Sequence, residues 1–148
     1  MNDYQTNEKI LLLVIKTLGK IPGRTYLQKL FFLIERELFP KLDLNLNYIK
    51  YHYGPFSKNL QVMVDSLKKK HMISEVNISS GEHATHFYLL TTDGKDKVEI
   101  IAEKEPKITK EIKSFCDRFQ NHSPSELLRF VYARYPDWTV NSVLNQEF

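Results

Sequence analysis

GRTYLQKLFFLIE at residues 23–35 and YHYGPFSKNLQVMVDSL at residues 51–67 are the two stretches that decide the fold of this chain. In the first stretch, apolar residues recur at the 3.6-residue period of a helix. Thr25 and Gln28 have the spacing of a capping box, and Pro40 cannot continue a helix. We therefore expect a helix that begins at Thr25 and ends at Pro40.

The second stretch predicts a turn followed by another helix. The alternating, β-branched and aromatic residues from Leu44 to Tyr53 indicate a short strand. Gly54-Pro55 is a turn signal, and Ser57 is a favourable N-cap for a helix that reaches Lys70. Its core-facing residues are expected to be Leu60, Met63 or Val64, and Leu67. Its other side should carry Lys58, Gln61, Val62, Asp65 and Lys68.

Further elements follow on both sides of these stretches. A first helix capped by Thr6 or Asn7 should run through Leu18 and end at Gly19 and Pro22. Two strands, at residues 73–78 and 86–90, are expected with a polar turn at residues 79–85 between them. The remaining expected helices lie at residues 93–104, at residues 107–120, and from the capping box Ser123-Pro124-Ser125-Glu126 to Tyr135.

Composition places the chain among ordinary globular proteins. Its 148 residues are 42% hydrophobic and 26% charged, which suits one domain with a packed core. A net charge of +3 neither demands nor excludes an anionic partner. One cysteine excludes an internal disulfide and suits a reducing cytoplasm. The longest apolar run, residues 10–15, is too short to span a bilayer, and the start lacks the features of a signal peptide. We therefore expect a cytoplasmic protein.

Two resemblances arise from these motifs, and together they cover roughly residues 8–100. LKKKHMISEV, a polar turn and FYLLTTDGKDKV resemble the recognition-helix end, wing and following helix of winged-helix regulators of the MarR and PadR types. Leu27-Gln28-Lys29-Leu30 and Tyr53-Gly54-Pro55 are similar to the SocA-like Panacea antitoxin domain. One departure is the long connection between the second and third helices, where a tight helix-turn-helix has only about three or four residues.

The expected fold is a single α+β domain that is mostly helical. Residues 1–92 should form a winged-helix-like core of three helices and a β-hairpin wing, and residues 93–148 a C-terminal helical extension. The Panacea resemblance implies a non-enzymatic regulatory protein that neutralises a toxin by direct contact. We expect an interface with an aromatic shelf beside the third helix. Its residues are Tyr51, Tyr53, Phe56, Lys58, Gln61, Val62 and Asp65.

A winged-helix transcriptional regulator is the alternative function, and DNA is then the partner. Asn and Gln side chains can read base edges, and lysines can neutralise phosphates. The residues available for this are Lys58, Asn59, Gln61, Lys68, Lys69 and Lys70. Against this alternative, Asp65 lies in the middle of the same face, and the hairpin segment carries Glu75 and Glu82. A second copy of the chain is a further candidate partner.

Catalytic and metal chemistry find little support in the sequence. His83 and His86 have an H-x-x-H spacing, but the expected turn would not preorganise a metal site. Cys116 falls on the apolar stripe of its helix, which favours a buried structural thiol. We expect no cofactor and no enzyme activity. A structural subunit remains a third class of function, because one short segment carries Phe130, Tyr132, Tyr135 and Trp138.

Overall fold

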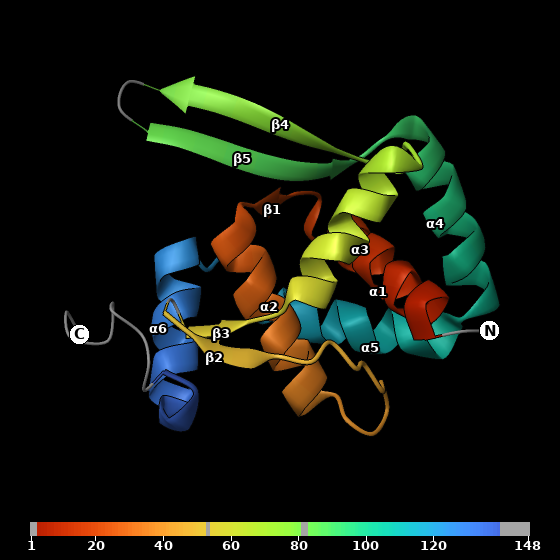
Figure 1. The fold of residues 1–148 in the computed structure, drawn as a ribbon. Coiled ribbons are helices and arrows are strands. Elements are labelled where there is room, and N and C mark those ends of the chain that lie inside the picture. The colour runs from red at the N-terminus through yellow and green to blue at the C-terminus, as the bar shows by residue number, and fades with distance from the viewer. Residues whose placement is uncertain (1–2, 53, 81–82, 140–148) are drawn as a thin grey trace.

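The computed structural model describes residues 3–52, 54–80 and 83–139 and has an α+β fold in which most residues are helical (Figure 1). Within these residues, every helix is too short or too polar to span a bilayer. In chain order the elements are α1 (Asp3–Leu18), β1 (Ile21–Pro22), α2 (Arg24–Glu37), β2 (Ile49–Tyr51), β3 (Gly54–Phe56), α3 (Lys58–Lys69), β4 (Ile73–Ser80), β5 (His83–Leu90), α4 (Thr92–Lys104), α5 (Pro106–Asp117), α6 (Pro124–Arg134) and the 3-10 helix η1 (Pro136–Thr139).

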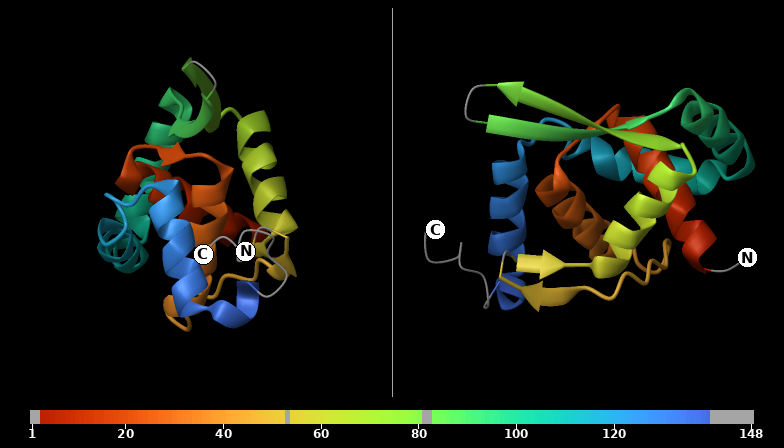
Figure 2. Two further views of the ribbon diagram at one scale, coloured as in Figure 1. Left: turned by 90° about the vertical axis from the view of Figure 1, so that its left-hand side faces the viewer. Right: turned by 45° about the horizontal axis from the view of Figure 1, so that its top comes forward.

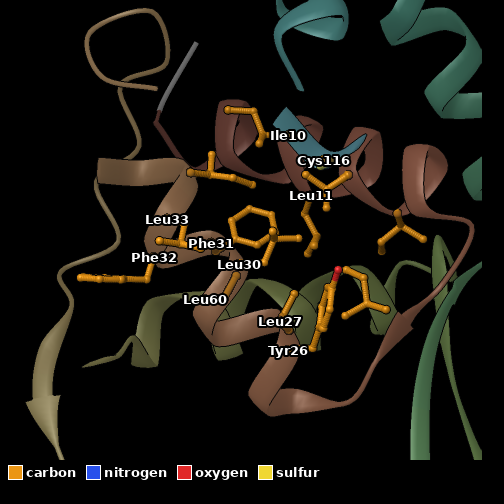
Figure 3. Packing of buried hydrophobic residues seen from close by; sticks show 14 of the residues in the cluster. Ile10, Leu11, Tyr26, Leu27, Leu30, Phe31, Phe32, Leu33, Leu60 and Cys116 are labelled. Carbon is orange, nitrogen blue, oxygen red and sulfur yellow. The ribbon is translucent and has the colours of Figure 1, made fainter. Parts of the chain in front are cut away.

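Helix α2 lies at the centre of the core. Its residues 26–34 are all buried, and so are residues 10–15 of α1. A helix that is covered on every side must be surrounded by other elements, and here α1 packs against α4 and α5 while α2 packs against α6. Figure 3 shows Leu11, Leu30 and Phe31 within the resulting cluster of apolar side chains. Residues of the expected core and of the expected C-terminal extension therefore share one buried cluster.

Two small antiparallel sheets flank the helices. The first has the strand order β1-β5-β4, and β4 pairs with β5 from Ile73 opposite Leu90 to Ser80 opposite His83. The second consists of β2 and β3. Helix α3 connects the two sheets, with the β2–β3 hairpin before its N-terminus and the β4–β5 hairpin after its C-terminus (Figures 1 and 2).

Two predicted N-caps are confirmed. The Ser57 hydroxyl accepts a hydrogen bond from the Leu60 backbone N–H at 3.0 Å and caps α3. At the start of α6, the Ser123 hydroxyl accepts from the Glu126 N–H at 3.1 Å, and the Glu126 carboxylate accepts from the Ser123 N–H at 3.2 Å. Helix α1 ends, as expected, before Gly19, whose φ of 81° is readily adopted only by glycine. It begins at Asp3, however, so the predicted cap at Thr6 or Asn7 is wrong.

The predicted capping box at the start of α2 is wrong. The helix begins at Arg24 with Gly23 as its N-cap, and no side chain caps it. Gln28 is 4% exposed and directs its amide to the backbone of Ser57 instead. Thr25 and Gln28 have the spacing of a capping box, but Gln28 bonds to Ser57, which is distant in sequence, and is not available to cap the helix.

The predicted strand at residues 44–53 is shorter than expected, because β2 covers only Ile49–Tyr51. The preceding residues alternate between buried and exposed without strand pairing. The buried members are Leu42, Leu44, Leu46 and Tyr48. The Leu46 N–H donates to the Glu35 carboxylate at 2.9 Å, so this segment is held by α2. Its alternation reflects packing against the core, which a period of two cannot distinguish from a sheet.

The β4–β5 hairpin is longer than predicted. Residues 79, 80 and 83–85 were expected in a turn, but the structure places them in the two strands. Glycine, glutamate and alanine in residues 79–85 weaken the local strand signal, and cross-strand pairing decides the outcome. His83 accordingly lies on β5.

The aromatic residues near the C-terminus pack inward. They are Phe130, Tyr132, Tyr135 and Trp138. The ring centroids of Tyr135 and Trp138 lie 5.2 Å and 5.1 Å from that of Phe32. Phe130 lies 5.2 Å from Phe119 in the same way. Tyr132 is buried, and the other three are half-buried against the core, so part of the aromatic surface from which a structural subunit was inferred is used within the chain.

Candidate protein-interaction site

The Leu-Gln-Lys-Leu segment of α2 holds the turn into α3 through Gln28. The Gln28 amide donates to the Ser57 carbonyl at 2.9 Å and accepts from the Ser57 N–H at 2.8 Å. The Tyr48 hydroxyl donates to the Gln28 carbonyl at 2.7 Å. All three residues are buried, so each bond also satisfies polar groups that water cannot reach.

Lys29 makes a second link to the same turn. Its ammonium donates to the Pro55 carbonyl at 2.9 Å, and the residue is only 4% exposed. Burial lowers the pKa of Lys29 to about 8, because desolvation disfavours the charged form. At neutral pH the side chain therefore remains mostly protonated and donates a charge-assisted hydrogen bond.

Gly54, the first residue of β3, lies against α6. Its φ of 90° favours glycine, and a Cβ at this position would lie 3.0 Å from Cε1 of Tyr132. On the adjoining side, η1 contacts β2 and β3. The ring of Trp138 lies 4.5 Å from the Arg36 guanidinium and 5.7 Å from the Lys50 ammonium. The β2–β3 hairpin is thus fixed by α2, α6 and η1.

The hairpin presents an apolar surface to solvent. Tyr51 is 43% exposed, and its ring centroid lies 5.5 Å from that of Phe56. Ile49 lies opposite Phe56 and is 53% exposed. Ile49 was missed in the sequence reasoning, although its position two residues before Tyr51 places both on one face of β2. The third predicted aromatic residue, Tyr53, lies outside the described residues.

Helix α3 supplies the rest of the predicted face. Val62 is 49% exposed, and Lys58 and Asp65 are exposed as well. Gln61 is half-buried, and its amide donates to the Asp65 carboxylate at 3.3 Å. The inward register is also as predicted, with Leu60, Met63, Val64 and Leu67 buried.

Two lysines of the nucleic-acid alternative lie beside carboxylates of this chain. Lys68 lies 3.8 Å from Glu75, and Lys70 pairs with the buried carboxylate of Glu8 at 3.0 Å. Lys58, Asn59 and Lys69 are exposed. Two members of the lysine triplet are therefore engaged with carboxylates of this chain.

The described residues contain no preformed metal site. Among residues 3–52, 54–80 and 83–139, no group of three His, Cys, Asp or Glu side chains could hold a metal ion. Burial raises the pKa of the Cys116 thiol to about 12, so it stays protonated at neutral pH. His86 lies 3.6 Å from Glu75 on the hairpin.

Comparison with known proteins identifies the family. Residues 27–139 match the family described as antitoxin SocA-like, Panacea domain, and the chain belongs to this family. The match contains Gln28, Lys29 and the hairpin that they hold. The family description indicates a regulatory role of the toxin–antitoxin type.

The chain is also similar to a protein of Bacillus subtilis (strain 168) described as uncharacterized protein YwgA. The two are 30% identical over 84 residues, which are 57% of this chain and 49% of that protein. The similarity therefore spans about half the length of that relative.

Proposed function

We propose that this chain is a non-enzymatic, cytoplasmic antitoxin that binds a toxin directly. The proposed contact, called the hairpin face below, comprises Tyr51, Tyr53, Phe56, Lys58, Gln61, Val62 and Asp65, together with Ile49. The observation that carries the proposal is the buried attachment of this hairpin to α2 by Gln28 and Lys29. Family membership supplies the class of partner.

The buried attachment supports binding because it preorganises an exposed apolar surface. Ile49, Tyr51 and Val62 are each more than two-fifths exposed, although a monomer gains stability by burying such side chains. A rigid hairpin loses little conformational entropy when a partner docks. Apolar residues bordered by Lys58 and Asp65 also match the usual arrangement of an apolar centre and a polar rim.

Coexpression with a toxin-like protein encoded beside this chain tests the proposal. We expect the chain to restore growth of cells that express the toxin and to copurify with it. Growth restored without a complex would contradict direct contact. A chain that neither restores growth nor copurifies with the adjacent toxin-like protein would contradict the antitoxin assignment.

A winged-helix DNA-binding regulator is the second candidate. It is favoured by the long β4–β5 hairpin that follows α3, and by exposed Lys58, Asn59 and Lys69 on that helix. It is disfavoured because residues 73–90 contain no Lys or Arg with which a wing could track phosphates. Titration of labelled DNA at several salt concentrations distinguishes the two. If this candidate is right, replacing Lys58, Lys68 and Lys69 together should lower the salt slope by about one unit per lost phosphate contact.

A further inference from the structure

Strand β4 is an edge strand of the three-stranded sheet. It pairs with β5 along all its residues from Ile73 to Ser80, and it pairs with no other strand of the described chain. In Figure 1 it forms the upper rim of the molecule, and no described element lies along its outer side in Figure 1 or Figure 2. Alternate backbone N–H and C=O groups of β4 therefore point away from β5 without a strand partner.

The edge lacks most of the features that usually prevent strand addition. Residues 73–80, ISEVNISS, contain no lysine and no proline, and the strand is uninterrupted by a bulge in its pairing with β5. Its one charged residue is Glu75, which lies 3.8 Å from Lys68 and 3.6 Å from His86. Glu75 therefore contacts ionisable side chains of its own chain.

Strand β4 carries two exposed apolar side chains. Val76 is 37% exposed and lies opposite Phe87, and Ile78 is 52% exposed and lies opposite Thr85. The Phe87 ring is covered in part by the ammonium of Lys20 at 4.5 Å from its centroid. Val76 and Ile78 are both on the edge strand, where a further strand would contact them, and Ile78 is the more exposed of the two.

We propose that β4 pairs in antiparallel orientation with β4 of a second copy of this chain, with Asn77 opposite Asn77 of the second copy. An added β-strand bonds to the whole open row of backbone groups at once, so an extended segment is the partner that fits this edge. In this register, Val76 of each copy lies opposite Ile78 of the other. The twofold symmetry therefore forms this apolar contact two times, once on each side of Asn77. The sheet becomes continuous across the twofold axis.

Two copies can meet in this register without bringing like charges together. In the proposed register each Glu75 lies opposite Ser79, so the two carboxylates are not cross-strand neighbours. A register centred on Glu75 would place them side by side and is disfavoured. Because the apolar face carries no charge in β4, two copies meet there without repulsion.

This contact is separate from the hairpin face. β4 follows the C-terminus of α3, whereas the hairpin face lies on β2, β3 and residues 58–65 in the first part of α3 (Figure 1). A dimer formed through β4 would leave both hairpin faces available and make the protein bivalent. The two proposals can therefore fail independently.

Disulfide trapping tests the register. Cys116 is the one cysteine of the chain and is buried, so Asn77→Cys introduces a single accessible thiol. Directly opposite residues in an antiparallel pair have Cα atoms about 4.5–5.5 Å apart, within the range that a disulfide spans. We expect mild oxidation to give a covalent dimer. Lys69→Cys, an exposed thiol on α3, is the control and should remain monomeric. Equal crosslinking of both variants, or of neither, would overturn the proposal.

Sedimentation equilibrium tests the surface, with the unmodified chain as the reference. We expect a concentration-dependent dimer whose dissociation constant rises at least about tenfold in Ile78→Lys, because the substitution places two like charges in the contact. Ile100→Lys is the matched control: Ile100 on α4 is 51% exposed, close to the 52% of Ile78, and its substitution should change nothing. A monomer at every concentration, or a dimer insensitive to Ile78→Lys, would overturn the proposal.

Hydrogen exchange distinguishes strand pairing from a contact between side chains alone. The alternate β4 amides that point away from β5 should exchange more slowly as concentration rises, while those bonded to β5 stay unchanged. Protection that appears only when a different protein is added would identify a heterologous strand as the occupant and would overturn pairing with a second copy.

Discussion

The ammonium of Lys29 on α2 lies 2.9 Å from the Pro55 carbonyl and donates a hydrogen bond to it. This bond joins the Leu-Gln-Lys-Leu segment directly to Gly54-Pro55 on β3, so the described residues of the two motifs that carried the family resemblance are in direct contact. The exposed hairpin is therefore attached to the most deeply buried helix of the molecule.

The titration of Lys29 should be visible in the pH dependence of stability. Its pKa is about 8 in the folded chain against 10.5 for an unperturbed lysine. Between these values the unfolded chain binds the proton that the folded chain has released, so stability rises with pH across this window. Through this group, the free energy of unfolding above pH 10.5 is higher by about 3 kcal/mol than it is below pH 8. Urea unfolding at a series of pH values measures it.

The Lys29→Met variant isolates this contribution. Burial raises the pKa values of Tyr26, Tyr88 and Cys116 to about 12, and each therefore reduces stability as the pH rises above its unfolded pKa. These three contributions are present in both proteins and cancel in the difference. We expect the difference in the free energy of unfolding, unmodified chain minus Lys29→Met, to increase between pH 8 and pH 10.5. Parallel curves would show that Lys29 has no depressed pKa.

Gln28 and Thr25 provide a direct test of how α2 begins. Gln28→Leu leaves the buried N–H and C=O of Ser57 unpaired, and each such group costs about 1–3 kcal/mol. Thr25→Ala should cost almost nothing, because Thr25 is exposed and α2 has no side-chain cap. Chemical denaturation of the two variants measures the difference. A larger loss of stability in Thr25→Ala than in Gln28→Leu would indicate that Thr25 caps α2 and would contradict the structure.

The turn at Gly54 can be examined with a second glycine as its reference. Gly54 and Gly19 have φ values of 90° and 81°, so alanine at either position costs about 1–2 kcal/mol for the left-handed backbone alone. A Cβ on Gly54 would also meet Tyr132 at 3.0 Å, whereas nothing lies within 4 Å of one on Gly19. We expect Gly54→Ala to lose about 1–3 kcal/mol more than Gly19→Ala in thermal or chemical unfolding. Equal losses would mean that α6 does not constrain the turn.

Local patterns predicted the helices well because their signals lie within a few residues of each other. Ser57 and Ser123 cap the helices that follow them, and the inward register of α3 came directly from its period. The errors came from distant partners. Gln28 had the spacing of a capping residue but bonds to Ser57, and Leu46 alternated as in a strand but is held by Glu35. Nothing local to Lys29 indicates that its ammonium is buried.

The candidate site was predicted in part for the same reason. Val62 and Asp65 follow from helical geometry, and the structure places both on the exposed side of α3. Ile49 was missed because an isoleucine in a presumed strand is expected to be buried, and only the short β2–β3 pairing leaves it 53% exposed.

The hairpin face should be disrupted by a charge at its apolar centre. Val62 is 49% exposed, so Val62→Glu should leave the fold intact. In a complex, however, the introduced carboxylate would lose its water without gaining a partner, at a cost of several kcal/mol. We expect the dissociation constant for the toxin to rise by about a hundredfold or more and growth rescue to be lost. Calorimetric titration of the purified proteins measures the affinity.

Two companion substitutions decide how far the face extends. Lys107→Glu changes an exposed residue of α5 and is the control, so binding should be unchanged. Ile49→Glu places the same charge on β2, and it should weaken binding as strongly as Val62→Glu if one partner covers both the hairpin and α3. Full affinity in Val62→Glu, with the fold verified by circular dichroism, would remove α3 from the interface. A loss confined to Ile49→Glu would instead locate the contact on the hairpin alone.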